Sequence, residues 1–170
     1  EGGTGLSAEI DGYCNLNHLL SVYTNLYYLS NPREHNGIST SRGETPSQNA
    51  IIYGSSVMSV PDQYMVRGGI NLTCSKFTMS AGIRHECVPS SDLIGGDYGF
   101  RRPGYVTSFE PGLIYEMKKG SVFFTSPVAL WRNRTQSYAD KNRTAATGVK
   151  AHGDAAFADY AINFGLSIKL

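Results

Sequence analysis

The last fourteen residues, Phe157-Ala-Asp-Tyr-Ala-Ile-Asn-Phe-Gly-Leu-Ser-Ile-Lys-Leu170, alternate between two kinds of side chain. One set of alternate positions holds Ala158, Tyr160, Ile162, Phe164, Leu166, Ile168 and Leu170, and the other holds mostly polar or small residues. A period of two residues is typical of a β-strand with one face in an apolar environment. Strands of soluble domains usually have about five or six residues, whereas a tilted strand that crosses a bilayer needs about 9–11. The stretch therefore predicts a membrane-spanning strand, with the last strand of a soluble β-sandwich as the alternative.

The composition is compatible with a β-rich membrane chain and argues against other classes. The chain has 170 residues, the size of one domain, and no apolar run is long enough to predict a membrane-spanning helix. Charged residues make up 17%, the net charge is +1 and the calculated pI is about 8.0, so no nucleic-acid partner is expected. Nineteen glycines, eleven tyrosines and seven phenylalanines suit a β-rich chain with aromatic belts.

Six further segments alternate in the same way, and each is expected to be a strand. They are residues 5–14, 19–29, 63–74, 77–88, 104–117 and 121–132. Residues 51–60 are apolar but alternate poorly, so they belong either to a long loop or to an eighth strand. The pattern predicts no helix.

The connections between these strands alternate between short and long. The short ones are residues 15–18, 75–76 and 118–120, and the long ones are residues 30–62, 89–103 and 133–155. Outer-membrane barrels have short periplasmic turns and long external loops, whereas a Greek-key sandwich has no reason to sort its loops by length. The spacing therefore predicts an all-β fold, namely an antiparallel up-and-down transmembrane β-barrel.

The number of strands bears on whether this barrel is complete. With the last strand pointing to the periplasm, the first of seven strands also points there, and Glu1 begins in an external loop. Single-chain bacterial barrels normally have an even number of strands. We therefore expect residues 1–170 to be the C-terminal portion of a larger closed barrel, with an odd number of strands before Glu1. Counting residues 51–60 as a strand instead gives a complete small barrel but spoils the sorting of the loops.

The apolar set of alternate positions carries almost no charge, His85 being the exception. An Arg or Lys on the lipid face at the bilayer midplane would cost about 2–4 kcal/mol. Aromatic residues of this set lie near the strand ends, as interfacial girdles do: Tyr28, Tyr105, Tyr160, Phe77 and Tyr115. The opposite set is predicted to line the lumen, and its charged members are Glu9, Asp11, Arg67, Arg84, Glu86, Glu110, Glu116, Asp159 and Lys169. Their mixed signs suit either a narrow polar path or a lumen plugged through salt bridges.

Several short strings carry a resemblance to a known family. They are Ser59-Val-Pro-Asp-Gln-Tyr64 with Gly68-Gly69, Gly95-Gly-Asp-Tyr-Gly-Phe-Arg-Arg-Pro-Gly-Tyr105, Glu110-Pro-Gly112, Pro127-Val-Ala-Leu130, Arg132-Asn-Arg-Thr-Gln-Ser137 and Gly153-Asp-Ala-Ala-Phe-Ala-Asp-Tyr160. In this order and spacing they resemble outer-membrane β-barrels of Bacteroidota-type bacteria that are described only as candidate transporters. The final strand is also similar to the terminal strands that barrel-assembly machinery recognises, although Leu170 replaces the usual terminal aromatic residue. The resemblance implies a barrel in the bacterial outer membrane; it does not imply a substrate.

No catalytic, metal or cofactor site is expected. The four histidines are scattered, without ligand spacing, and nothing pairs a nucleophile with a base. Cys14, Cys74 and Cys87 also lack metal-type spacing and are either small apolar fillers or, for Cys14 and Cys74, a disulfide. Three charged residues of the second long loop either bind a substrate or brace the loop: Asp97, Arg101 and Arg102.

These observations leave three candidate functions. The first is an outer-membrane channel or transporter for small solutes, with membrane lipid as its surroundings and the upstream part of the barrel or other envelope proteins as partners. The second is a structural or accessory barrel subunit of a larger cell-envelope complex. The third is a secreted, soluble β-sandwich that acts as a binding module.

Overall fold

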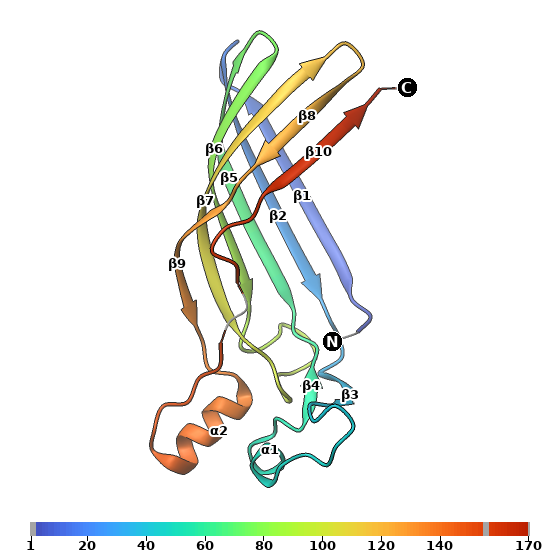
Figure 1. Ribbon diagram of the computed structural model, residues 1–170, viewed down its shortest axis with the longest axis vertical. Coiled ribbons are helices and arrows are strands. Elements are labelled where there is room, and N and C mark those ends of the chain that lie inside the picture. The colour runs from blue at the N-terminus through green and yellow to red at the C-terminus, as the bar shows by residue number, and fades with distance from the viewer. Residues whose placement is uncertain (1–2, 155–156, 170) are drawn as a thin grey trace.

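The computed structural model describes residues 3–154 and 157–169, of which most form antiparallel β-structure, with 53% strand and 10% helix. One sheet of eight strands curls into a half-barrel (Figure 1). Its strands are β1 (Leu6–Asn15), β2 (Leu20–Ser30), β5 (Gln63–Cys74), β6 (Phe77–Val88), β7 (Gly104–Met117), β8 (Gly120–Thr125), β9 (Val128–Arg134) and β10 (Asn163–Ile168). They pair antiparallel in the order β1-β2-β5-β6-β7-β8-β10, and β9 pairs with the first half of β7. The expected all-β, antiparallel architecture is confirmed.

The alternation of the sequence is kept from strand to strand across the sheet. Asn25 of β2 lies opposite Asp11 of β1 and Arg67 of β5. Arg67 in turn lies opposite Arg84 of β6. Because directly opposite residues of paired strands share a face, the apolar set stays on the convex face and the polar set on the concave face.

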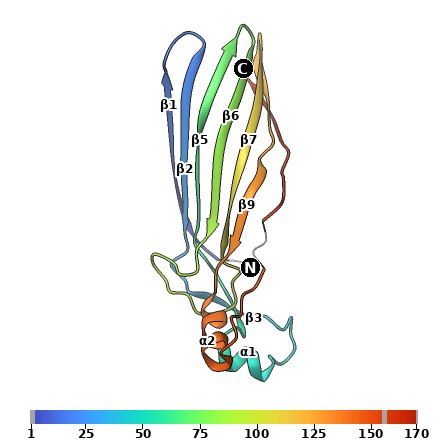
Figure 2. The same cartoon turned by 90° about the vertical axis from the view of Figure 1, so that its left-hand side faces the viewer.

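Short and long connections lie at opposite ends of the sheet, as expected. The short turns are residues 16–19, 75–76 and 118–119, and Ser75 adopts the left-handed conformation (φ 56°) that a two-residue hairpin turn requires. The long connections gather at the other end in a cap of loops and short elements (Figures 1 and 2). Strand β1 begins at the cap end, and β10 ends beside the short turns (Figure 1).

The expected strand over residues 121–132 is divided into β8 and β9. Pro127 interrupts it because proline has no N–H to donate to a ladder. A β-bulge follows, since Thr107 lies opposite Trp131 while the next residue, Ser108, lies opposite Ala129. The extra residue, Leu130, shifts the alternation by one position, so that Arg132 lies opposite Val106 on the concave face. Strict alternation would have placed the Arg132 charge on the convex face.

The last strand is shorter than expected. It is regular only over Asn163–Ile168, although an isolated bridge from Tyr160 to Val128 continues the same register. The interruption lies opposite Pro127, whose carbonyl accepts a hydrogen bond from the Ala161 N–H but which cannot return one. Leu170, the final residue of the predicted strand, lies outside the described residues.

The long connections contain structure that the sequence pattern did not predict. Strands β3 (His35–Ser39) and β4 (Val57–Ser59) form a separate two-stranded sheet, and α1 (Gln48–Tyr53) lies between them in the chain. The alternative in which residues 51–60 form an eighth barrel strand is therefore wrong. The third long connection contains α2 (Tyr138–Thr147), so the expectation of no helix is also wrong.

Both helices have ordinary end signals. Ser47 caps α1 by accepting from the Ala50 N–H, and Ser137 and Asp140 form a capping box at α2. Glycines in the left-handed conformation, Gly54 and Gly148, end the two helices. Within the described part of the chain, no helix is long and apolar enough to cross a membrane.

The three cysteines are free thiols, so the disulfide left open for Cys14 and Cys74 is not formed. Cys14, Cys74 and Cys87 lie opposite Val22, Phe77 and Tyr105 respectively, which places all three on the convex face.

Candidate functional site on the concave face

The two faces of the sheet differ in the kind of side chain that they hold. Large apolar side chains project from the convex face of every strand and are exposed, among them Ile10, Leu26, Ile70, Ile83 and Leu166. On the concave face most buried side chains are polar, with Asn25, Ser108 and Glu110 almost fully enclosed, and Val106 is an apolar exception. This is the reverse of a water-soluble sheet, in which the apolar face is buried and the polar face is wet.

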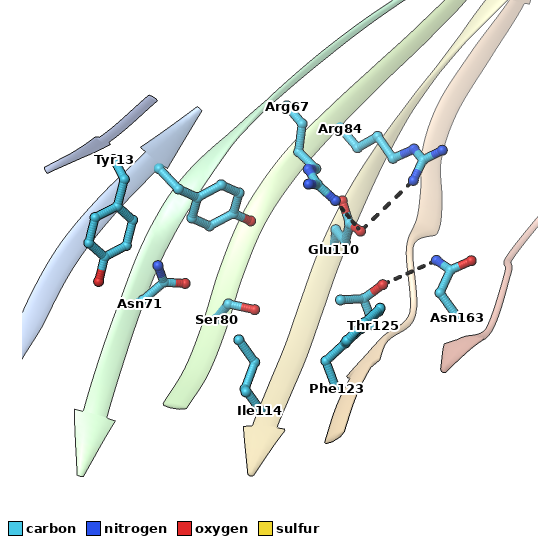
Figure 3. Close-up of a pocket in the computed structure, with 11 residues that line it drawn as sticks. Tyr13, Arg67, Asn71, Ser80, Arg84, Glu110, Ile114, Phe123, Thr125 and Asn163 are labelled. Atoms are coloured by element: carbon cyan, nitrogen blue, oxygen red, sulfur yellow. Dashed lines mark hydrogen bonds and ion pairs between the residues drawn. The ribbon is translucent and has the colours of Figure 1, made fainter. Parts of the chain in front are cut away.

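Glu110 lies at the centre of the concave face, with only 2% of its side chain exposed. Its Oε1 atom lies 3.5 Å from Nη1 of Arg67 and 3.9 Å from Nη1 of Arg84 (Figure 3). Arg84 also donates to Glu86 at 2.8 Å. The two arginines thus share one buried carboxylate, and Arg84 has a second one, so the four charges compensate one another.

A second polar group lies beside this cluster on β1 and β2. Nδ2 of Asn25 donates to the Glu9 carboxylate at 2.6 Å and to the Asp11 carboxylate at 2.7 Å. The amide, with its two N–H groups, holds together two like charges that would otherwise repel. Six of the predicted lumen-lining residues are therefore brought together on neighbouring strands: Glu9, Asp11, Arg67, Arg84, Glu86 and Glu110.

Two glycines make room for the Tyr23 side chain beside the arginine cluster. Gly69 and Gly82 lie opposite each other, and a Cβ atom at either position would collide with the hydroxyl of Tyr23. The Tyr23 ring therefore covers these two glycines, an arrangement in which an aromatic side chain protects a glycine of the neighbouring strand. The guanidinium carbon of Arg67 lies 5.9 Å from the centre of that ring, so the tyrosine also supports the arginine.

A hollow lies against the concave face beside the arginine cluster. Its volume of about 540 Å³ is within the size range of small-molecule sites. It extends from Tyr13 on β1 to Asn163 near the other edge of the sheet, and Arg67, Arg84 and Glu110 form part of its wall (Figure 3). Several buried atoms of the cluster have no hydrogen-bond partner among the described residues: Asn25 Oδ1, Arg67 Nε, Arg84 Nε and Glu110 Oε2. The cluster thus retains hydrogen-bonding capacity that its protein partners do not use.

The structure places the other three predicted lumen residues elsewhere on the same wall. Asp159 forms an ion pair with Arg132, which the bulge at Leu130 has turned toward it. Glu116 lies opposite Ser121 close to the short turns, and the Lys169 N–H donates to the Lys119 carbonyl at that same end. None of these three joins the Glu110 cluster within the described part of the chain.

Of the predicted loop residues, Arg101 joins the second long loop to the first through buried hydrogen bonds. Its guanidinium donates to both carboxylate oxygens of Asp92 at 2.8 Å, and both side chains have 0% exposure. It also donates to Ser59 Oγ of the first long loop. Asp97 has no ion pair among the residues that the structure describes, and Arg102 lies over the Phe100 ring, 5.6 Å from its centre.

The cap contains a second buried carboxylate that the sequence did not point to. Asp62, fully buried, accepts from the Tyr28 hydroxyl at 2.6 Å and from the Asn31 N–H at 2.7 Å. Its own N–H donates to Asp92. The first two long loops are therefore joined to each other and to the end of β2 by one continuous set of buried hydrogen bonds.

Other concave-face residues were missed because they are uncharged. Asn25, Tyr23, Asn71, Ser80 and Thr125 all occupy the same alternate positions as the charged residues. The prediction of lumen-lining residues was limited to charged side chains. Including neutral side chains at the same alternate positions would have identified these residues, since the strand register places all of those positions on one face.

No family model, curated protein or solved structure matches this chain. The resemblance to outer-membrane barrels of Bacteroidota-type bacteria therefore stays a prediction.

Proposed function

We propose that this chain forms part of an outer-membrane β-barrel through which small solutes pass. The observation that supports the proposal best is the separation of faces: an exposed apolar band covers the convex side, while the charged side chains of the strands lie on the concave side. A bilayer accepts an apolar outer face and leaves a polar inner face for water. A soluble sandwich would instead cover the apolar face with a second sheet.

The edges of the sheet support a larger barrel. Strands β1 and β10 form the two ends of the pairing order, and within the described residues nothing pairs them with each other. Both run from the cap toward the short turns (Figure 1). Unpaired strand edges are not tolerated in lipid, and two edges with the same direction can be joined through antiparallel pairs only by an odd number of further strands. The proposal therefore includes such strands, supplied by the rest of the barrel.

Conductance of the purified complete barrel, with the further strands that close the sheet, tests this proposal in a planar lipid bilayer. Insertion of single molecules should produce discrete steps of current, because a polar concave wall leaves a path for ions. A folded and inserted protein that carries no current would count against solute passage.

The same result would favour the second candidate, an accessory subunit of an envelope complex. A specific observation supports it: Leu93, with 80% exposure, and Ile94 project from a braced loop of the cap. Exposed apolar side chains on a rigid surface are typical of a protein interface.

A further inference from the structure

We infer that the hollow on the concave face binds a neutral, polyhydroxylated solute, namely a small sugar. The inference rests on the proposed function in one respect, because it takes the concave wall to be part of the solute's path. It adds the chemical class of solute, which follows from three properties of the hollow.

The first property is the presence of aromatic rings on an otherwise polar wall. In the described strands of the main sheet, exposed large hydrophobic side chains lie on the convex face, with the exceptions of the bulged Leu130 and of Tyr13 and Phe123. Tyr13 is 63% exposed and Phe123 is 41% exposed, and both line the hollow (Figure 3). Exposed aromatic surface facing a polar path calls for an explanation, since the wall has no lipid to meet.

The Phe123 ring has a suitable orientation for stacking. It lies opposite Gly165, and a Cβ atom built on that glycine would overlap three atoms of the ring. One face of the ring therefore covers the glycine, and its uncovered side belongs to the lining of the hollow. The electron-rich face of an aromatic ring attracts C–H groups, which line the flat faces of a sugar ring.

The second property is a row of neutral hydrogen-bonding groups beside the two rings. Asn71 of β5, Ser80 of β6, Thr125 of β8 and Asn163 of β10 lie at one level of the concave face, and Gly112 of β7 lies between Ser80 and Thr125 (Figure 3). Amides and hydroxyls both donate and accept, which matches sugar hydroxyls that do the same.

The third property is charge compensation. Arg67 and Arg84 are the cations of the lining, and each is already paired with a carboxylate, Glu110 or Glu86. An anionic or zwitterionic solute would have to break these pairs to gain a counter-charge, whereas a neutral solute does not. The hollow therefore favours a neutral ligand.

Saturation-transfer NMR on the purified protein in detergent micelles tests the inference, with glucose and maltotriose as neutral probes and glucose 6-phosphate as the anionic probe. We expect saturation of the sugar C–H protons for both neutral probes and weaker binding of the phosphate. Failure of both neutral sugars to bind, or tighter binding of the phosphate than of glucose, would overturn the inference.

Variants of the ring locate the binding site. Phe123→Leu keeps an apolar cover over Gly165 but removes the aromatic face, so the Kd for maltotriose should rise at least about tenfold, while Phe123→Tyr should stay within about threefold. Phe124→Ala, its neighbour on the convex face, is the matched control and should leave the Kd unchanged. Sugar binding that is indifferent to Phe123→Leu would refute the assignment to this hollow.

Conductance measured on the same preparations separates the two proposals. Ion current that maltotriose does not reduce, together with absent sugar binding, would overturn the sugar site and leave solute passage standing. Sugar binding that depends on Phe123 in a protein without current would support the site and overturn passage.

Discussion

The Glu110 carboxylate is almost fully buried, and the charges of its neighbours offset the free-energy cost of removing it from water. Its charge is shared by Arg67 at 3.5 Å and Arg84 at 3.9 Å, both of which keep part of their surface exposed. A buried charge is costly alone, and removing one member of such a group leaves the others uncompensated. Glu110 therefore holds the two guanidinium groups together over the centre of the concave face.

Replacing Glu110 by glutamine should lower the free energy of unfolding in micelles by about 1–3 kcal/mol, less than for a fully buried pair because both arginines can rehydrate. Urea titration followed by the fluorescence of Trp131, the single tryptophan, measures the change. Glu116→Gln is the matched control, on the same face of the same strand but exposed, and should cost less than about 0.5 kcal/mol. Equal losses in the two variants would contradict the role given to Glu110.

At the scale of single elements, the long strands could be predicted from the sequence and the irregular ones could not. Strands β5, β6 and β7 begin and end where the alternation does, because one medium on each face imposes a period of two. Pro127 and the bulge at Leu130 break that rule locally, and a bulge shifts the pattern without changing the residue types. Helix α2 was not predicted, because a polar helix without an apolar stripe has no hydrophobic periodicity in the sequence.

The cap was the least predictable element. Arg101 and Asp92 lie only nine residues apart, but Arg101 also donates to Ser59 of another loop. No local pattern encodes a hydrogen bond between two loops, since it depends on how the strands bring the loop ends together. The sequence therefore left both bracing and substrate binding open for Arg101, and only the bidentate contact at 0% exposure distinguishes them.

Arg101→Ala should loosen the cap without unfolding the sheet. Loss of the buried cation leaves Asp92 uncompensated, so residues 30–62 and 89–103 should be cut by chymotrypsin at least about tenfold faster. Limited proteolysis with mass spectrometry of the fragments measures this. Arg102→Ala removes a neighbouring cation that stacks on Phe100 and should leave the cutting rate close to that of the unmodified protein. Faster cutting within the strands as well would show that the effect is not confined to the cap.

At the scale of the whole molecule, the exposed apolar band of the convex face is the feature that separates a lipid environment from water. Ile70 lies about midway along β5 and is 50% exposed, between rows of aromatic residues toward the two ends of the sheet. If water covered this face, a polar substitution there would cost little. If lipid covers it, a charge at this height is expensive.

Ile70→Arg should therefore reduce the free energy of folding into phosphatidylcholine vesicles by about 2–4 kcal/mol. The adjacent substitution Asn71→Arg, which points to the concave face, should change it by less than about 1 kcal/mol. Urea titration of the folded fraction, followed by electrophoretic mobility without boiling, measures both. Similar behaviour of the two variants would remove the support that the separation of faces gives to a membrane barrel.

The pairing order of the sheet has a consequence for how the molecule acquires its shape. Most neighbouring strands of the main sheet are also successive strands of that sheet in the sequence. The exceptions are the β7–β9 and β8–β10 pairs. The entropic cost of closing a loop rises by only about 0.6 kcal/mol for each doubling of its length, so the long connection between β2 and β5 costs about 2 kcal/mol more than a tight turn. The half-barrel can therefore assemble one hairpin after another, without a step in which distant parts of the chain must find each other first. The β7–β9 pair continues the β7–β8 hairpin in the same register, so the β8–β10 pair, which is separated by the third long connection, is the one expected to form last.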